Sequence, residues 1–270
     1  MSLKIFIGSS SNNEDSAIES IYEYTLRKNS SSDLDITWMR QTKDLNSVWA
    51  GWDSKNWFTP FSGFRWAIPE ICNFKGRALY TDVDMINFRD ISDLFEVDLK
   101  DKPFGSRVVK VRNISFPSFN FRNVMKFKNP IKIKRFSGFQ PCVMLIDCEK
   151  AKYFLDPVSH QKNDANIHNT YMKSFIKKPL LRESKFFSEI DPRWNCLDGE
   201  NLAIDEIFQL HFTNMSTQPW EPEWFTGDKK SHPRKDIVDL FHILLEEAAE
   251  NGFKPKTISG PRIEYKIIGS

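Results

Sequence analysis

The chain has 270 residues, 40% of them hydrophobic, with a formal net charge of +2 and four cysteines. This length allows a sizeable core in one domain or two. The near balance of charge argues against a protein that neutralises nucleic-acid phosphates along a strand, and the cysteines lack the paired spacing of a zinc site or a disulfide framework.

The expected compartment follows from the same composition. The apolar runs are too short for a bilayer span, and Met1 leads into a strand-like run rather than a secretory signal. We therefore expect a cytoplasmic protein with reduced thiols, for which peripheral contact with a membrane surface stays open.

The first elements in chain order predict a parallel α/β sheet. An apolar run at Leu3–Ile7 predicts a buried strand, and apolar residues at helical spacing predict a helix from Glu14 to about Arg27. Further strands are predicted near Ile36–Met39 and after Gly76. The order strand, helix, strand is typical of the start of a parallel sheet.

Aromatic residues are frequent between these elements. Trp49, Trp52 and Trp57 are expected to pack in a loop against the core, although a ring beside an opening could also stack on a sugar. From Lys100 to Arg135, phenylalanines are scattered among basic residues. Their alternation is too poor for a single-stranded nucleic-acid platform, so we expect no nucleic-acid partner.

The clearest helix lies near the C-terminus. Residues Pro233 to Asn251 carry apolar side chains at helical spacing, and Gly252 follows the predicted end. The apolar positions are Ile237, Leu240, Phe241, Leu244, Leu245 and Ala248. We expect this helix to be scaffold. Because no repeat or low-complexity linker divides the chain, we expect a single domain over residues 1–270.

Two aspartates follow the third predicted strand directly. Alternation along an extended backbone puts Asp82 and Asp84 on the same side and Val83 on the other. At the carboxyl edge of an α/β sheet, where such folds bind ligands, two carboxylates suit a divalent metal that carries phosphates. The pattern also arises by chance in solvated turns, so its flanks decide its meaning.

Five further segments, which lie on both sides of the two aspartates, carry recognisable patterns in a fixed order along the chain. The segments are Lys4–Gly8, Phe64–Ile71, Asp90–Phe95, Val143–Asp147 and His211–Trp220. Together with the aspartates they resemble the nucleotide-sugar glycosyltransferases of the GT-A fold, most closely glycosyltransferase family 8, which includes glycogenin and short bacterial galactosyltransferases. The resemblance implies an α/β fold: a single Rossmann-like domain with a mixed, mainly parallel central sheet flanked by helices. It implies a nucleotide-binding half at about 1–98 and an acceptor-side half at about 99–270.

The resemblance assigns metal and catalytic roles. Asp82, Asp84 and His211 are the implied ligands of Mn²⁺ or Mg²⁺, and mixed oxygen and nitrogen donors suit Mn²⁺ better than Ca²⁺. Without this context, His211 would be interpreted as a core histidine in an apolar strand. Arg65, Asp82 and Asp84 are the implied catalytic residues. A guanidinium at position 65 can bond sugar hydroxyls and phosphates, with a surface salt bridge as the alternative.

The resemblance also implies the residues that bind the two parts of the donor. The implied nucleotide-binding residues are Phe6, Ile7, Gly8, Arg65, Thr81, Asp82 and Val83. The implied substrate-binding residues are Gln140, Pro141, Cys142, Gln218 and Trp220. Gly8 would allow a close approach of the nucleoside to the backbone.

The chain departs from the family pattern in the loop after His211. Asn214-Met215-Ser216 stands where the family has a mid-loop glycine, and Gln218 replaces a lysine before Pro-Trp. The diphosphate would thereby lose a cationic contact, which Lys229, Lys230 or Arg234 could replace. The simpler interpretation is that these three residues are solvated charges on the surface.

Two further departures concern the sugars. Gln140-Pro141-Cys142 stands where many members have Asn-Ser-Gly beside the donor sugar, which leaves the identity of that sugar open. Glu183 is the nearest counterpart of an acidic residue on the family's acceptor side.

The implied function is a metal-dependent, retaining hexosyltransferase. It would move a hexose from a UDP-sugar to a hydroxyl of a glycan, a lipid-linked acceptor or a protein. Because no Asp/Glu nucleophile pair is evident, a front-face route is favoured over a double displacement. One alternative is a noncatalytic sugar-binding or scaffold protein derived from a transferase, motivated by Gln218. The other is a sugar-phosphate nucleotidylyltransferase, which would need more glycines and a cation in Gly8–Asn13.

Overall fold

The computed structural model describes residues 2–110, 137–178, 183–220 and 230–259. Its centre is a seven-stranded sheet in the order β2-β1-β3-β6-β5-β8, with β7 paired to β6. The strands are β1 Leu3–Gly8, β2 Leu34–Met39, β3 Arg77–Asp82, β5 Phe104–Lys110, β6 Ser137–Asp147, β7 Lys177–Lys178 and β8 Phe187–Glu189. Strand β2 begins two residues before the predicted one.

A single strand of this sheet is reversed. Strand β1 pairs in parallel with β2 and β3, and β5 pairs in parallel with β8, whereas β6 is antiparallel to β3, β5 and β7. The mixed, mainly parallel sheet predicted from the resemblance is therefore confirmed. Its register sets Gly8 opposite Asp82 and Thr81 opposite Val143, so the ends of β1 and β3 meet the middle of β6.

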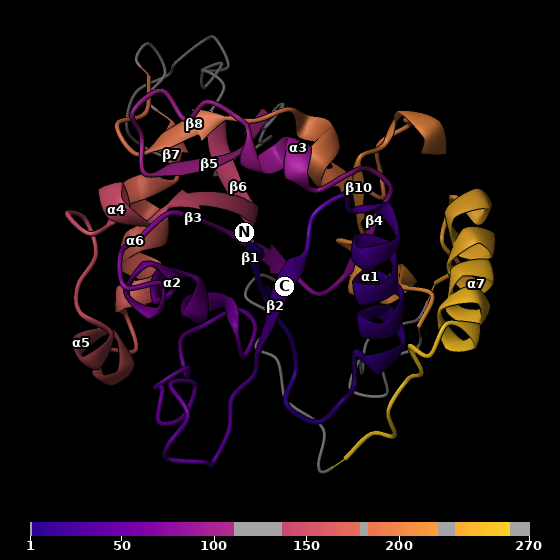
Figure 1. Ribbon diagram of the computed structural model, residues 1–270, viewed down its shortest axis with the longest axis horizontal. Helices are drawn as coiled ribbons and strands as arrows, with labels where there is room; N and C mark the ends of the chain where they lie inside the picture. The colour runs from indigo at the N-terminus through magenta and orange to yellow at the C-terminus, as the bar shows by residue number, and fades with distance from the viewer. Residues whose placement is uncertain (1, 111–136, 179–182, 221–229, 260–270) are drawn as a thin grey trace, which may run out of the picture.

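The central strands are buried on both faces, as near-continuous apolar runs predict. Ile5, Ile7, Leu79, Tyr80 and Leu145 are all fully buried. Helices cover the two sides of the sheet (Figure 1). They are α1 Ser16–Asn29, α2 Ile68–Ile71, α3 Ser92–Phe95, α4 Cys148–Ala151, α5 Val158–Asn163, α6 Ile167–Phe175 and α7 Lys235–Glu250.

Helices α1 and α7 lie side by side, on the opposite side of the molecule from α2, α4 and α6 (Figure 1). The apolar stripe predicted for the last helix packs inward, with Ile237, Phe241, Leu244 and Ala248 buried. The other two predicted positions, Leu240 and Leu245, are partly buried against the same core.

Local hydrogen bonds shift the start of α1. The sequence predicts a start at Glu14, but the helix begins at Ser16. The backbone N–H of Ser10 donates to a carboxylate oxygen of Asp15, and that of Glu14 donates to Oδ1 of Asn12. These bonds hold the chain in a turn through residue 15, because short polar side chains compete with the helix for backbone donors.

Residues Phe64–Ile71 form two short helical pieces rather than one helix. The 3₁₀ turn η1 Ser62–Trp66 carries Arg65, and α2 follows with Pro69 in its first turn. Aromatic packing holds η1, since the rings of Trp49, Trp52 and Trp57 lie 5.0 to 5.2 Å from that of Phe64. The predicted packing of these tryptophans in a loop against the core is confirmed.

A second, smaller sheet carries His211. Its strands are β4 Met85–Asn87, β9 Cys196–Leu197 and β10 Gln209–His211, in the order β4-β10-β9. Antiparallel pairing sets His211 opposite Met85, directly after the second aspartate. Three 3₁₀ turns, η2 Pro192–Asn195, η3 Ile204–Glu206 and η4 Met215–Thr217, lie on either side of β9 and β10 in the chain.

After α7 the chain returns to the beginning of the fold. Gly252 adopts the left-handed φ of 92° that glycine permits, and Phe253 packs its ring 5.7 Å from that of Tyr24 on α1. The N–H groups of Lys256 and Ser259 donate to Ser16 Oγ and to the Asn12 carbonyl, and Asn13 Nδ2 donates to the carbonyl of Thr257. Residues 253–259, called the C-terminal strap below, thus fasten the turn that follows β1.

Other expectations meet mixed outcomes. All four cysteines are free, as expected. Of the basic segment from Lys100 to Arg135, residues 111–135 lie outside the described part of the chain.

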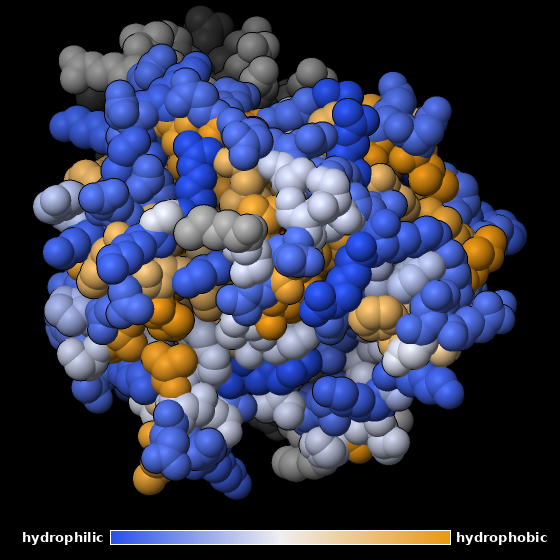
Figure 2. Space-filling model, viewed as in Figure 1, coloured by the Kyte–Doolittle hydropathy of each residue, from blue (hydrophilic) through white to orange (hydrophobic). Residues whose placement is uncertain are grey.

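No helix in the described ranges combines the length and apolar character that a membrane span needs. On the face in Figure 2, hydrophilic side chains predominate and hydrophobic ones form small separate groups.

Candidate functional site

The site lies where β1, β3 and β6 meet. Asp82 ends β3 opposite Gly8, and an added Cβ at Gly8 would lie 2.4 Å from the ring of Phe61. The close approach at Gly8 is therefore made by an aromatic ring of the chain itself. Phe6 and Ile7 bury their side chains in the core, and their backbones pair with both β2 and β3. Their contact with a nucleotide stays a prediction.

Arg65 ties Asp82 to the neighbouring strand. Its guanidinium is 4% exposed, which excludes the surface salt bridge. It donates to Tyr80 Oη at 3.0 Å and to the carbonyl of Pro141 on β6, and it lies 3.4 Å from Asp82 Oδ1. The Tyr80 hydroxyl in turn donates to the same Asp82 oxygen. Burial, with a further contribution from Asp82, raises the pKa of Tyr80 and keeps this hydroxyl a donor.

Asn195 orients His211 from the other side. The two residues are buried, and His211 Nδ1 lies 2.8 Å from Asn195 Oδ1. Asn195 Nδ2 donates to the Gln140 carbonyl at 3.5 Å, so its Oδ1 is the atom that faces the ring. Since Nδ1 then carries the proton of this bond, Nε2 is the nitrogen that points into the site. The sequence prediction missed Asn195.

His211 Nε2 faces the second aspartate. It lies 3.2 Å from Asp84 Oδ1, a buried oxygen that makes this ion contact but no hydrogen bond. Burial lowers the pKa of His211, but the nearby Asp84 and Asp82 carboxylates outweigh burial and raise it overall. Burial raises the pKa of Asp84. This position thus attracts positive charge, from a proton on the imidazole or from a cation.

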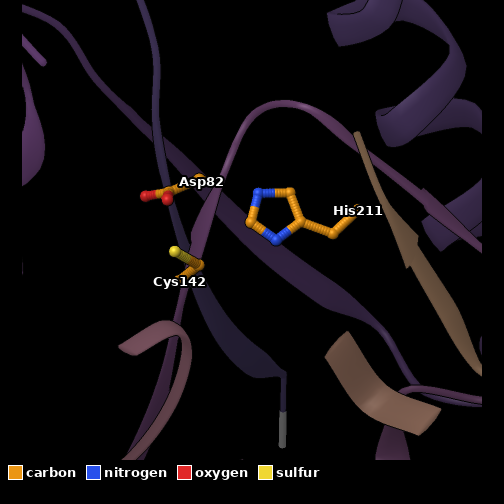
Figure 3. A group of neighbouring side chains, drawn as sticks. All are labelled: Asp82, Cys142 and His211. Atoms are coloured by element: carbon orange, nitrogen blue, oxygen red, sulfur yellow. The ribbon is translucent and has the colours of Figure 1, made fainter. Parts of the chain in front are cut away.

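Three different donor atoms converge beside this contact (Figure 3). A carboxylate oxygen of Asp82, Sγ of Cys142 and a ring nitrogen of His211 all lie within 4.8 Å of one another. Asp84 Oδ1 lies next to them, in contact with His211, and this oxygen, nitrogen and sulfur set fits a divalent cation. The structure thus brings together Asp82 and His211 as the sequence predicts, and it adds Cys142, for which the sequence predicts a substrate role.

The other residues predicted to bind the nucleotide or the substrate make contacts within the protein. The Gln140 carbonyl accepts a hydrogen bond from Ser106 Oγ. Gln218 donates to the Phe212 carbonyl at 3.1 Å. Trp220 is buried, with its ring 5.8 Å from that of Phe241. Thr81 and Val83 are buried on either side of Asp82. Their binding roles stay predictions.

The cations considered as replacements for the missing lysine differ in their surroundings. Arg234 donates to the carbonyls of Glu200 and Leu202 at 2.9 Å each and forms an ion pair with Asp236. Lys230 is exposed, and Lys229 lies outside the described residues.

Glu183, the weak candidate for the acceptor side, forms an ion pair with Lys102 at 3.0 Å. The Glu183 side chain is 81% exposed, whereas that of Lys102 is 14% exposed. The role of Glu183 toward an acceptor stays a prediction.

Comparison with known proteins places the fold. No protein-family model and no curated protein matches the sequence. The galactosyltransferase LgtC, solved with donor and acceptor sugar analogues, superposes with a TM-score of 0.53 at 9% identity, covering 91% of this chain and 96% of that one. The bifunctional glycosyltransferase WbbM gives 0.52 at 11% identity, covering 92% of this chain and 51% of WbbM. The glycosyltransferase GlyE of Streptococcus pneumoniae gives 0.50 at 15% identity, covering 96% and 65%.

The chain thus spans nearly all of LgtC but about half of WbbM. At sequence identities of 9% to 15%, the similarity to these structures establishes the fold alone. The mixed sheet with its flanking helices is the fold of the GT-A glycosyltransferases.

Proposed function

We propose that this protein is a retaining hexosyltransferase that moves a sugar from a UDP-sugar to an acceptor hydroxyl on a glycan, a lipid-linked acceptor or a protein. The observation that carries the proposal is the meeting of Arg65, Asp82 and His211 at the carboxyl end of β3. In an α/β sheet this edge is where ligands bind. The free cysteines support residence in a reducing compartment such as the cytoplasm.

Asp82, Asp84 and His211 would hold the metal, Mn²⁺ or Mg²⁺. When bound, such an ion stabilises negative charge on the departing diphosphate as a Lewis acid. The contact between Asp84 Oδ1 and His211 Nε2 at 3.2 Å supports this assignment, because it brings two of the donor atoms together at one place.

The chain's own residues contribute by positioning. Arg65 fixes the Asp82 carboxylate and the β6 backbone at Pro141 in one geometry. Asn195 fixes the His211 ring. Such prior orientation lowers the barrier because little reorganisation is left for the transition state. No protein nucleophile is assigned, in keeping with a front-face transfer in which the leaving phosphate assists deprotonation of the acceptor.

The test is turnover of a panel of UDP-sugars and other nucleotide sugars with Mn²⁺, in the parent and in Asp82→Asn. We expect donor hydrolysis or transfer in the parent and a loss of at least about 100-fold in Asp82→Asn, because the amide removes the anionic donor. Asp93→Asn is the control, since that carboxylate is 55% exposed in an ion pair with Arg89.

Each alternative has its own outcome. Binding of a nucleotide sugar without turnover by the parent would favour the scaffold protein. Release of pyrophosphate from a nucleoside triphosphate and a sugar phosphate would favour the nucleotidylyltransferase. Equal activity of Asp82→Asn and the parent would contradict the assigned site.

A further inference from the structure

Cys142 differs from the other cysteines of the chain in where its sulfur lies. Cys72, Cys148 and Cys196 are at most 3% exposed and belong to the hydrophobic core. Cys142 is partly exposed and sits in the middle of β6, with Sγ among the donor atoms of Asp82 and His211 (Figure 3). Cys142 also packs against this core, but it is the cysteine whose sulfur reaches the donor atoms of the candidate site.

The neighbours of Cys142 fix the geometry of this group. Arg65 donates to the carbonyl of Pro141, the residue before Cys142, and also contacts Asp82. Asn195 bonds both His211 Nδ1 and the Gln140 carbonyl, two residues before the cysteine. One guanidinium and one amide thus join the strand that carries the sulfur to the residues that carry the oxygen and nitrogen donors. This is the arrangement of a supported ligand set, in which outer contacts hold the inner ones.

A sulfur donor changes which ions such a site selects. Thiolates favour borderline and soft ions such as Zn²⁺ and Co²⁺, whereas Mg²⁺ requires oxygen donors and gives up its water reluctantly. A site of carboxylate and imidazole alone would discriminate between these ions much less.

We propose that Cys142 ligates the metal through Sγ, in addition to Asp82, Asp84 and His211, so that the site selects thiophilic divalent ions over Mg²⁺. On binding, the S–H bond breaks, the sulfur forms a bond to the ion, and the proton leaves to solvent. The inference rests on the proposed metal-dependent function, which it deepens by naming a ligand and the ion class.

The experiment is a titration of the full-length protein with Co²⁺, followed by absorption. Thiolate ligation gives a sulfur-to-cobalt charge-transfer band in the near ultraviolet, and any ligation gives weaker d–d bands in the visible range. We expect both in the parent and only the d–d bands in Cys142→Ser, with affinity for Co²⁺ reduced at least about tenfold. Cys148→Ala, which removes a fully buried sulfur of α4, should keep both.

Competition and alkylation test the parent protein without relying on a variant. A large excess of Mg²⁺ should leave the charge-transfer band of the parent intact. Bound Co²⁺ or Zn²⁺ should slow the alkylation of Cys142 by iodoacetamide, as read by mass spectrometry, whereas Mg²⁺ should not.

The outcomes separate the two proposals. Visible d–d bands without a charge-transfer band in the parent, together with unchanged alkylation, would overturn the role of Cys142 and leave the metal-dependent transferase standing. No Co²⁺ signal and no binding of Mn²⁺ by calorimetry would overturn the metal site itself.

Discussion

At the scale of single residues, Arg65 combines contacts that lysine cannot make together. Its planar fork reaches Ser62, Tyr80 and Pro141 as well as Asp82, and the group is almost fully buried. A lysine has a compact charge on a flexible stem and can satisfy only part of this set. The position therefore constrains the shape of the side chain as well as its charge.

Arg65→Lys is expected to lower kcat/KM on the order of 100-fold, because a small misplacement of Asp82, a proposed metal ligand, would be costly to catalysis. Steady-state kinetics with the best donor of the panel would measure this. Arg27→Lys, at a 41% exposed guanidinium paired with Glu23, is the matched control and should match the parent. Parent-like kinetics in Arg65→Lys would remove Arg65 from the machinery of the site.

Asn195→Ala should weaken Mn²⁺ binding by about 10- to 100-fold, since the His211 ring loses the partner that sets its orientation. Asn195→Asp should retain most of the affinity, because a carboxylate oxygen also accepts the Nδ1–H. Isothermal calorimetry of both variants gives the comparison. Equal losses in the two would point to general damage around the buried position rather than to this hydrogen bond.

Some residues of this centre could be foreseen from sequence and others could not. Asp82 and Asp84 stand out because they directly follow an apolar strand, and His211 because of the segment that it opens. Asn195 precedes the histidine that it orients by 16 residues and lies at the end of a 3₁₀ turn that no periodicity marks. Its contact depends on how two short strands pair, which is a nonlocal property.

At the scale of elements, α6 depends on a histidine that must stay neutral. Trp66 Nε1 donates to His168 Nδ1 at 3.0 Å, and the ring is buried. Burial, with a further contribution from Arg65, lowers the pKa of His168 from 6.5 to about 3. Because the folded state binds this proton less readily than the unfolded chain, the contribution of His168 to stability is present above pH 6.5 and is lost as the pH falls toward 3.

His168→Gln should therefore flatten the loss of stability on acidification. The parent should lose up to about 1.4 kcal/mol of unfolding free energy per pH unit from this group within that window, and the variant should lack this slope. Urea unfolding at several pH values between 7 and 4 would measure it. The same substitution at the exposed His242 is the control, and a parent-like slope in His168→Gln would assign acid sensitivity to other groups.

The larger elements follow from local patterns, and the smaller ones do not. Periodicity predicts β1, α1, β2 and α7 within about two residues, because their apolar faces are long enough to repeat. The turn η1 forms where tryptophan rings close around Phe64, a cause that involves distant residues. The family resemblance implied a mixed sheet without saying which strand is reversed, and periodicity does not reveal strand direction, so the direction of β6 was not predicted.

At the scale of the whole molecule, the C-terminal strap links the two ends of the described chain. Phe253→Ala should lower the unfolding free energy by about 2 kcal/mol, less than the 3 to 5 kcal/mol typical of a fully buried phenylalanine. It should also speed hydrogen exchange in residues 9–16, which the strap holds. Ile243→Ala, at a 61% exposed side chain on α7, is the control. Unchanged exchange in Phe253→Ala would show that the turn after β1 is stable without the strap.

The strap also has a consequence for the order of events in biosynthesis. Asn13 and Thr257 are separated by 244 positions, yet they bond directly. On the ribosome, the turn that follows β1 emerges long before residues 256–259, so its last hydrogen-bond partners do not exist until those residues are made. A chain interrupted before residue 256 would therefore carry β1 and α1 with that turn still open.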